Sequence, residues 1–370
     1  MGGIGEFMVK EINLKPEIIK GLIDNSGFNE EEVAKKSKIS LKSLKEGKLT
    51  IPQLKKLANV LKRPIAAFFS NEIPSLPKTP DYRLNRNKRI NPEVFLAQRK
   101  LIYLLEKLKD LGIEKSIIPT VKSNISPSQL AKEFRKYLGI ELIKNQKPNI
   151  ILNKYKEIIE DKMKFLIIEY PLKPVRSEGS DDVRAFSIYY SDLGGIVLNE
   201  TDHPSVKLFS LFHEVCHLLK RNSGICSLEY EVENEYEEES LCNKFSAEFL
   251  VPSDDLKNEV QNYTLSEENI LGSISALSKI YGVSKQVILL RLLYLDFLTS
   301  EQYFLLRMQL EEKEKKQIGR RNWEEVFKNR TGNLTIREVK KALQQNKISF
   351  YEALNILDVK TQYAEKFLYE

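Results

Sequence analysis

Cysteine, histidine and long apolar runs are scarce in this chain of 370 residues. The three cysteines are an odd number, and no two of them form a C-x-x-C pair. This usage fits reduced thiols in a cytosol better than a disulfide framework. No apolar run approaches the roughly 18 residues that a bilayer-crossing helix needs. We therefore expect a soluble cytoplasmic protein with no membrane partner.

Length and charge limit the expected number of domains and the expected classes of partner. A chain of this length exceeds one ordinary core, so two or three domains are expected. The formal net charge of +6 is modest for the size, and only local clustering could indicate nucleic-acid binding. Residues 1–7 are rich in glycine and precede a second methionine, which is typical of a cloning tag rather than a signal peptide. We expect the native start at Met8.

Two of the three histidines share a motif with a recognisable chemistry. Residues 213–217 read His-Glu-Val-Cys-His, the H-E-x-x-H pattern. Residues four apart on a helix share a face, so His213 and His217 can hold one Zn²⁺ ion while Glu214 stands beside it. Zinc held in this way lowers the pKa of a water molecule towards about 7. Glu214 would take the proton of that water and pass it to the leaving amine.

A third zinc ligand is expected from a second helix downstream. The acidic run at 229–239 precedes a predicted helix that ends at Leu250. On this helix, only Glu238 and Glu239 lie on or beside the apolar stripe. Asn243 follows Glu239 by one turn and could orient a ligand by a hydrogen bond. Glu239 is therefore the preferred ligand, with Glu238 as the alternative.

Further candidates for the chemistry are less specific. The candidate donors to an oxyanion are Tyr189, Tyr190, Tyr230, Tyr236 and His203, although such residues are more often part of the core or the surface. Cys216 and Cys242 could gate activity through oxidation or mixed coordination. Buried cysteine is more often a small apolar filler.

The N-terminal region predicts short amphipathic helices at Glu30–Ser37, at 41–47 with Ser40 as N-cap, and at Ile51–Leu61, a helix-turn-helix spacing. Six lysines crowd the turn and the second helix: Lys35, Lys36, Lys38, Lys42, Lys45 and Lys48. A DNA-binding helix-turn-helix would contact DNA phosphates through this turn and second helix. The alternative is the solvated face of a small helical bundle.

The middle of the chain alternates between helical and extended patterns. Helices are predicted at 95–111, at Pro127–Leu138 and near 150–162. Extended segments are predicted at 165–168, Ala185–Tyr190 and 195–198, the last after a Leu-Gly-Gly turn, and the H-E-x-x-H helix at 205–221 follows them. After residue 266 the pattern is almost wholly helical, and 274–295 predicts two helices with Ser284 as N-cap of the second.

These patterns predict an α+β protein. We expect an all-α helix-turn-helix at the N-terminus, a central zincin-like small sheet packed with the H-E-x-x-H helix, and a helical C-terminal region. The predicted divisions are 8–72 for the helix-turn-helix, 73–125 for a linker and bridging helix, 126–265 for the zinc-binding domain and 266–370 for the C-terminal helices.

The motifs resemble a known family. The segments 210–219, 223–226 and 239–252 closely resemble the ImmA/IrrE metallopeptidases, whose pattern has H-E-x-x-H and then E-x-x-(A/C)-N-x-F-A-A-x-L-x-P. The resemblance carries the family's glutamate ligand onto Glu239. The N-terminal segment is similar to the Xre-type helix-turn-helix often fused to such peptidases. It is about two residues shorter between Ser40 and Gly47 and lacks the usual Trp-Glu pair.

The resemblance implies a cytosolic zinc endopeptidase that cleaves a specific helix-turn-helix repressor and so controls stress or mobile-element genes. The alternative is a DNA-binding transcriptional regulator or antitoxin-like protein that uses its zinc site for sensing or stability. A protein substrate is the expected partner, DNA is a further candidate, and a homodimer is compatible with either function.

Overall fold

The computed structural model describes residues 11–73, 92–121, 125–172, 183–222, 232–266, 268–313 and 322–368. The tag expected at 1–7 lies outside these residues. The chain folds as two compact units, one of residues 1–100 with 172–182 and the other of residues 101–171 with 183–370. No helix within the described ranges is both long enough and apolar enough to cross a membrane.

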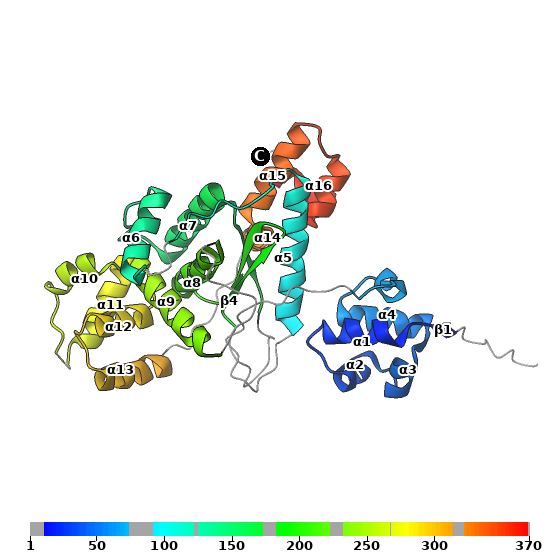
Figure 1. Ribbon diagram of the computed structural model, residues 1–370, viewed down its shortest axis with the longest axis horizontal. Helices are drawn as coiled ribbons and strands as arrows, with labels where there is room; N and C mark the ends of the chain where they lie inside the picture. Colours follow the sequence, from blue (N-terminus) through cyan, green and yellow to red (C-terminus); the bar gives the residue numbers. More distant parts are fainter. Residues whose placement is uncertain are drawn as a thin grey trace, which may run out of the picture. The chain divides into compact units, whose positions relative to one another are not determined.

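The first unit is mainly helical (Figure 1). Its elements are β1 (Glu11–Asn13), α1 (Pro16–Asp24), α2 (Glu30–Ser37), α3 (Leu41–Glu46), β2 (Lys48–Thr50), α4 (Ile51–Leu61), the 3-10 helix η1 (Ile65–Phe69) and the beginning of α5 (Pro92–Asp110). Asn29 caps α2 through a capping box with Glu32, and Ser40 caps α3 by accepting from the N–H of Ser43. These local signals are why the predicted helix boundaries here are confirmed.

The first unit also contains a small sheet that the pattern did not predict. β1 pairs with β2 in antiparallel fashion, Ile12 opposite Leu49. The strands have three residues each, too few to show alternation, and their partners are distant in sequence. Gly47 makes the close approach possible, because its φ is +71° and a Cβ there would lie 2.1 Å from the carbonyl oxygen of Leu14.

The second unit is built around a three-stranded mixed sheet in the order β3-β5-β4. Its strands are β3 (Leu166–Tyr170), β4 (Ala185–Tyr190) and β5 (Leu193–Asn199). β3 runs parallel to β5, and β4 runs antiparallel to it. Every residue of β5 is buried, as expected for a central strand covered on both faces.

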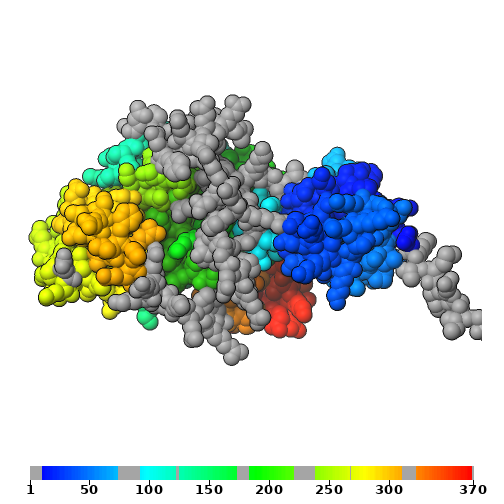
Figure 2. Space-filling model, turned by 90° about the horizontal axis from the view of Figure 1, so that it is seen from below, coloured from blue at the N-terminus to red at the C-terminus, as the bar shows by residue number. Residues whose placement is uncertain are grey.

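Helices cover this sheet and extend beyond it. They are the remainder of α5, α6 (Pro127–Leu138), α7 (Pro148–Met163), α8 (Pro204–Asn222), α9 (Val232–Leu250), α10 (Ser253–Val260), α11 (Ile270–Tyr281), α12 (Lys285–Tyr294), α13 (Ser300–Lys313), α14 (Trp323–Thr331), α15 (Asn333–Gln344), α16 (Phe350–Leu357) and α17 (Thr361–Leu368). The coarse expectation of an α+β, mostly helical protein is confirmed. Residues of α10 to α13, yellow to orange in Figure 2, form one continuous surface.

The connection between β4 and β5 corrects the expected Leu-Gly-Gly turn. The turn consists of Ser191 and Asp192, with φ of 51° and 69°, and both glycines lie inside β5. Two positive φ values in a two-residue connection match a type I′ hairpin. The glycines serve packing instead, since a Cβ on Gly195 would lie 2.8 Å from Leu101 of α5 and one on Gly194 would lie 2.7 Å from Phe165.

Candidate metal centre

Helix α8 carries the H-E-x-x-H motif in the core of the second unit. It begins at Pro204, where the proline needs no N–H partner, and His203 before it accepts from the N–H of Ser205 at Nδ1. The buried face of the helix includes Leu208, Leu211, Phe212 and Leu218, all fully buried. The apolar spacing therefore fixes which side of α8 faces inward, and both motif histidines are buried with it.

Helix α9 packs directly against α8. The Phe212 ring of α8 stacks on the Phe249 ring of α9 with centroids 4.0 Å apart. α9 begins at Val232, so the helix starts inside the acidic run rather than after it. The helix is therefore up to about two turns longer than one that follows the acidic run, and Glu238 and Glu239 lie within it, as the sequence prediction of the third ligand requires.

Three side chains converge between the two helices. The Nε2 atoms of His213 and His217 lie 3.0 Å apart. Glu239 approaches both, with Oε2 3.3 Å from Nε2 of His213 and Oε1 3.1 Å from Nε2 of His217. The candidate ligand atoms all lie within 4.8 Å of one another. The structure thus brings together the three residues that the sequence proposes as ligands.

The outer nitrogens of both imidazoles are held by polar side chains. Nδ1 of His213 lies 3.1 Å from Oδ1 of Asn243, and Nδ1 of His217 lies 3.3 Å from Oε1 of Glu238. Because both partners are acceptors, each Nδ1 donates to its partner, which leaves each Nε2 available to bind a metal ion. Glu238, the alternative ligand in the sequence prediction, therefore supports His217 from outside the cluster.

The electrostatics of the cluster favour a cation between these groups. Burial would raise the pKa of Glu239, but its hydrogen bonds with His213 and His217 lower that pKa well below its ordinary value. Burial would lower the pKa of His217, but the Cys242 thiol, Glu238 and Glu239 raise it overall. Two imidazole nitrogens and one ionised carboxylate are the donor types that Zn²⁺ prefers, so the residues present fit this ion.

Glu214 lies on α8 between the two histidines and is 6 % exposed. It is not one of the three clustered donors. A carboxylate in this position is next to the site without being consumed as a ligand, as the motif requires of a general base.

The two described cysteines line the same helix interface. Cys216 and Cys242 are both fully buried and in contact, and Cys242 also contacts His217. Burial is the largest cause of the raised pKa of Cys242. Both thiols occupy core positions, which fits the filler interpretation of the sequence. Cys226 lies outside the described residues.

The candidate oxyanion donors are spread over several elements. The hydroxyl of Tyr190 donates to Glu106 of α5 at 3.1 Å, while Tyr189 is partly buried against the main core. His203 stands at the start of α8, ten residues before His213, with Nδ1 2.8 Å from the Ser205 hydroxyl. Tyr230 and the side chain of Tyr236 lie outside the described part of the chain.

The six lysines of the proposed DNA-binding surface are all exposed. Lys35 and Lys36 end α2, Lys38 is its left-handed C-cap, Lys42 and Lys45 lie on α3, and Lys48 begins β2. Three of them form surface ion pairs at 3.6 to 3.9 Å with Glu30 or Glu46. Such pairs contribute about 1 kcal/mol or less and leave the lysines available to other anions.

The central region of the chain is similar to a known protein family. Residues 161–293 match the family model described as the IrrE N-terminal-like domain, a peptidase family designated M78. The match covers the sheet and helices α8 to α12, including the three clustered donors, and does not include the N-terminal helices. No curated protein and no solved structure matches the chain. The match supports the resemblance of this region to the ImmA/IrrE family and, with it, a peptidase.

Proposed function

We propose that the chain is a zinc-dependent endopeptidase in which His213, His217 and Glu239 hold the metal and Glu214 is the general base. The observation that carries this proposal is the convergence of three ligand atoms from α8 and α9 within 4.8 Å, with Glu214 between the two histidines. The family match over the same residues supports it. A structural zinc site would not need the glutamate inside the motif.

The metal ion and individual side chains have separate roles in the proposed hydrolysis. Zinc, when bound, supplies a Lewis acid that polarises the scissile carbonyl and acidifies a water molecule. Glu214 accepts the proton of the attacking water and delivers it to the leaving amine. Asn243 and Glu238 keep the imidazoles in the tautomer that presents Nε2, so the site needs little rearrangement when the metal enters.

The β4 edge of the sheet offers a place for the substrate backbone. Among the described residues β4 pairs with β5 alone, whereas β3, the other edge strand, packs against α14 and α15. α8 packs against β4, so this edge lies beside the motif helix. We propose that an extended peptide pairs with β4 in the manner of an added strand.

The proposed substrate is a specific helix-turn-helix repressor in the cytoplasm, because the ImmA/IrrE resemblance implies such a target. Cleavage of the repressor would derepress stress or mobile-element genes.

Co-expression with a candidate helix-turn-helix repressor tests the proposal. The unmodified chain should bind zinc and cleave the repressor, and Glu214→Gln should retain zinc while losing about 10²-fold to 10⁴-fold in cleavage rate. Glu157→Gln, which changes an exposed glutamate on α7, is the matched control and should cleave normally. Cleavage by Glu214→Gln at the unmodified rate, or absence of zinc from both proteins, would refute the proposal.

A second candidate function is a DNA-binding regulator. The observation that favours it is the sequence α2, turn, α3 with six exposed lysines in the first unit. DNA retardation should then fall steeply with salt, survive Glu214→Gln and weaken when Lys42 and Lys45 are replaced by Gln. Retardation that is insensitive to these replacements would favour the solvated-face interpretation. Sedimentation of the same samples would test for the homodimer.

A further inference from the structure

A cavity of about 1160 Å³ lies in the second unit, apart from the metal cluster. Its walls include residues 145–149 at the start of α7, residues 200–207 from the end of β5 into the first turn of α8, residues 282–285 at the start of α12, and part of α14. None of the three clustered metal donors lines it. The volume is that of a site for a whole small molecule.

The cavity opens where the parallel strands β3 and β5 end. Glu169 near the end of β3 and Glu200 just after β5 both line it. α7 leads into β3 and α8 follows β5, so the N-termini of both helices lie at this edge of the sheet, and α12 begins there too. The three helices have 16, 19 and 10 residues. Each N-terminus carries about half a positive charge, so their convergence favours an anion.

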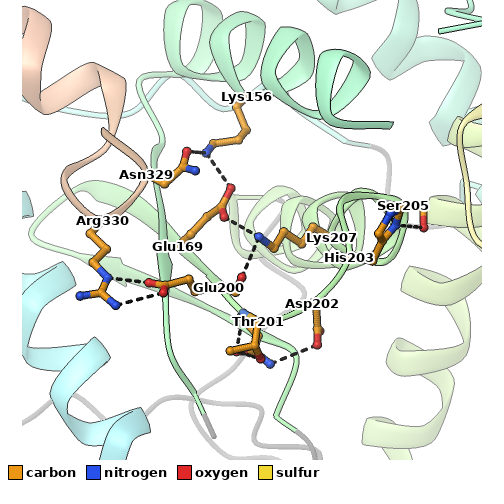
Figure 3. Close-up of polar contacts among 11 residues, drawn as sticks. Lys156, Glu169, Glu200, Thr201, Asp202, His203, Ser205, Lys207, Asn329 and Arg330 are labelled. Carbon is orange, nitrogen blue, oxygen red and sulfur yellow. Dashed lines mark hydrogen bonds and ion pairs between the residues drawn. The ribbon is translucent and has the colours of Figure 1, made fainter. Parts of the chain in front are cut away.

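Two buried lysines add full charges at the same place (Figure 3). Lys156 of α7 and Lys207 of α8 share one carboxylate, with Nζ 3.1 Å from Oε1 and 2.5 Å from Oε2 of Glu169. The exposed fractions of the three side chains are only 2 %, 7 % and 3 %. Their other partners are neutral, the Asn329 side-chain oxygen at 3.0 Å and the Glu200 carbonyl at 3.1 Å.

The cluster carries more positive than negative charge, and two of its members, Lys207 and Glu169, line the cavity. Burial would raise the pKa of Glu169, but Lys156 and Lys207 lower it overall, so the carboxylate is ionised. The two lysines share the one ionised carboxylate of Glu169. The buried Glu160 carboxyl also interacts with Lys156, but burial raises its pKa to about 7, so at neutral pH it compensates their charge only in part. Arg330 neutralises the nearby Glu200 carboxylate through a two-pronged contact. An anion in the cavity would compensate the remaining charge.

The outer lining is basic and rich in hydrogen-bonding groups. Four basic residues line it that form no ion pair with any described residue: Lys147, Arg184, Lys279 and Lys285. Two further acids also line it, Asp202, which accepts from Asn199, and the exposed Glu325. Amide and hydroxyl side chains line it as well, among them Asn145, Asn149, Asn153, Ser275, Ser278 and Ser284. Among the described lining residues there is no Phe, Tyr or Trp, and His203 supplies the one aromatic ring.

We propose that this cavity binds a sugar phosphate. The phosphate lies against Lys207 and the helix N-termini, with Arg184 and Lys285 as further cationic contacts. The amide and hydroxyl side chains bind the sugar hydroxyls, because these groups can donate and accept with neutral polyols. Binding at this site needs neither zinc nor peptidase activity, so it is tested independently of the proposed function.

Isothermal titration of the full chain with ribose 5-phosphate tests the proposal, with ribose and inorganic phosphate as comparison probes. Ribose 5-phosphate should bind more tightly than inorganic phosphate, ribose should give no binding, and the affinity should fall when salt is raised. Equal affinity for inorganic phosphate would overturn the sugar assignment. Binding of ribose at the same affinity, or no binding of either phosphate, would overturn the anion site.

Variants locate the binding in the cavity. Arg184→Gln combined with Lys285→Gln changes two residues outside the buried cluster and should weaken ribose 5-phosphate binding about tenfold or more. Lys207→Met should abolish it, and circular dichroism would show whether this buried replacement still folds. Lys257→Gln, on the exposed side of α10, is the matched control and should bind normally. Unchanged affinity in the double variant would contradict the assignment.

Discussion

Glu160 on α7 provides a quantitative test of the electrostatics of the second unit. Its side chain is fully buried, and Oε1 accepts from the N–H of Ile167 at 3.4 Å. Oε2 has no hydrogen-bond partner among the described residues. Burial raises the pKa of Glu160 from 4.5 to about 7, although Lys156 and the N–H groups of Ile167 and Leu334 oppose the rise.

The raised pKa determines how Glu160 affects stability at each pH. The folded protein holds this proton more tightly than the unfolded chain, so the favourable contribution is complete below about pH 4.5 and is lost as pH rises towards 7. At 1.36 kcal/mol per pKa unit, the difference between 4.5 and about 7 corresponds to about 3 kcal/mol. Glu160→Gln keeps the shape of the side chain and removes the titration.

Urea unfolding from pH 4.5 to 8 measures this effect. Glu160→Gln and the unmodified protein should have similar unfolding free energies at pH 4.5, and the variant should be more stable by up to about 3 kcal/mol at pH 8. Glu157→Gln on the exposed side of α7 should show no such pH-dependent difference. A constant difference between Glu160→Gln and the unmodified protein across this pH range would refute the reasoning.

Three further variants test other parts of the structure. Asn243→Ala removes the acceptor at Nδ1 of His213 and should weaken zinc affinity by about 10-fold to 100-fold in a competition titration with a chelating dye. Arg291→Met leaves the buried Glu248 carboxylate without its 2.5 Å partner and should reduce the unfolding free energy by about 3 to 5 kcal/mol in urea. Gly47→Ala places a Cβ against the Leu14 carbonyl at a positive φ and should lower the melting temperature of the chain. Gly112→Ala is the comparison, because its φ is also positive but nothing lies within 4 Å of the added Cβ. It therefore measures the cost of the positive φ without a steric contact.

Local signals in the sequence predicted much of the metal centre. His213 and His217 share a helix face because of their spacing, and this requires no knowledge of the tertiary fold. The third ligand, Glu239, is harder to predict from the sequence. Its prediction depends on the apolar stripe of a second helix and on Asn243 one turn later. The same stripe left Glu238 as an alternative, because helical periodicity alone does not distinguish a side chain pointing to a metal from one supporting its ligand.

The errors arose where distant residues determine the local structure. The Leu-Gly-Gly sequence predicts a turn, but Gly194 and Gly195 lie in β5. Glycine is needed at these positions because Leu101 and Phe165 occupy the space that a side chain would fill. The cluster around Glu169 was also missed. Its sequence signal was an acid inside the apolar strand Leu166–Tyr170, but the partners are 13 and 38 residues away. Pairings of that kind are fixed by the packing of α7 and α8.

The placement of the three clustered donors on α8 and α9 has a consequence for how the protein unfolds. A cation held by both helices would act as a cross-link between positions 217 and 239, which denaturation must break. At a free metal concentration about 1,000 times the dissociation constant, such linkage adds about 4 kcal/mol to the folded state. Preparations of identical sequence but different residual zinc would melt at different temperatures, so thermal comparisons among variants require a buffer that fixes the free zinc concentration.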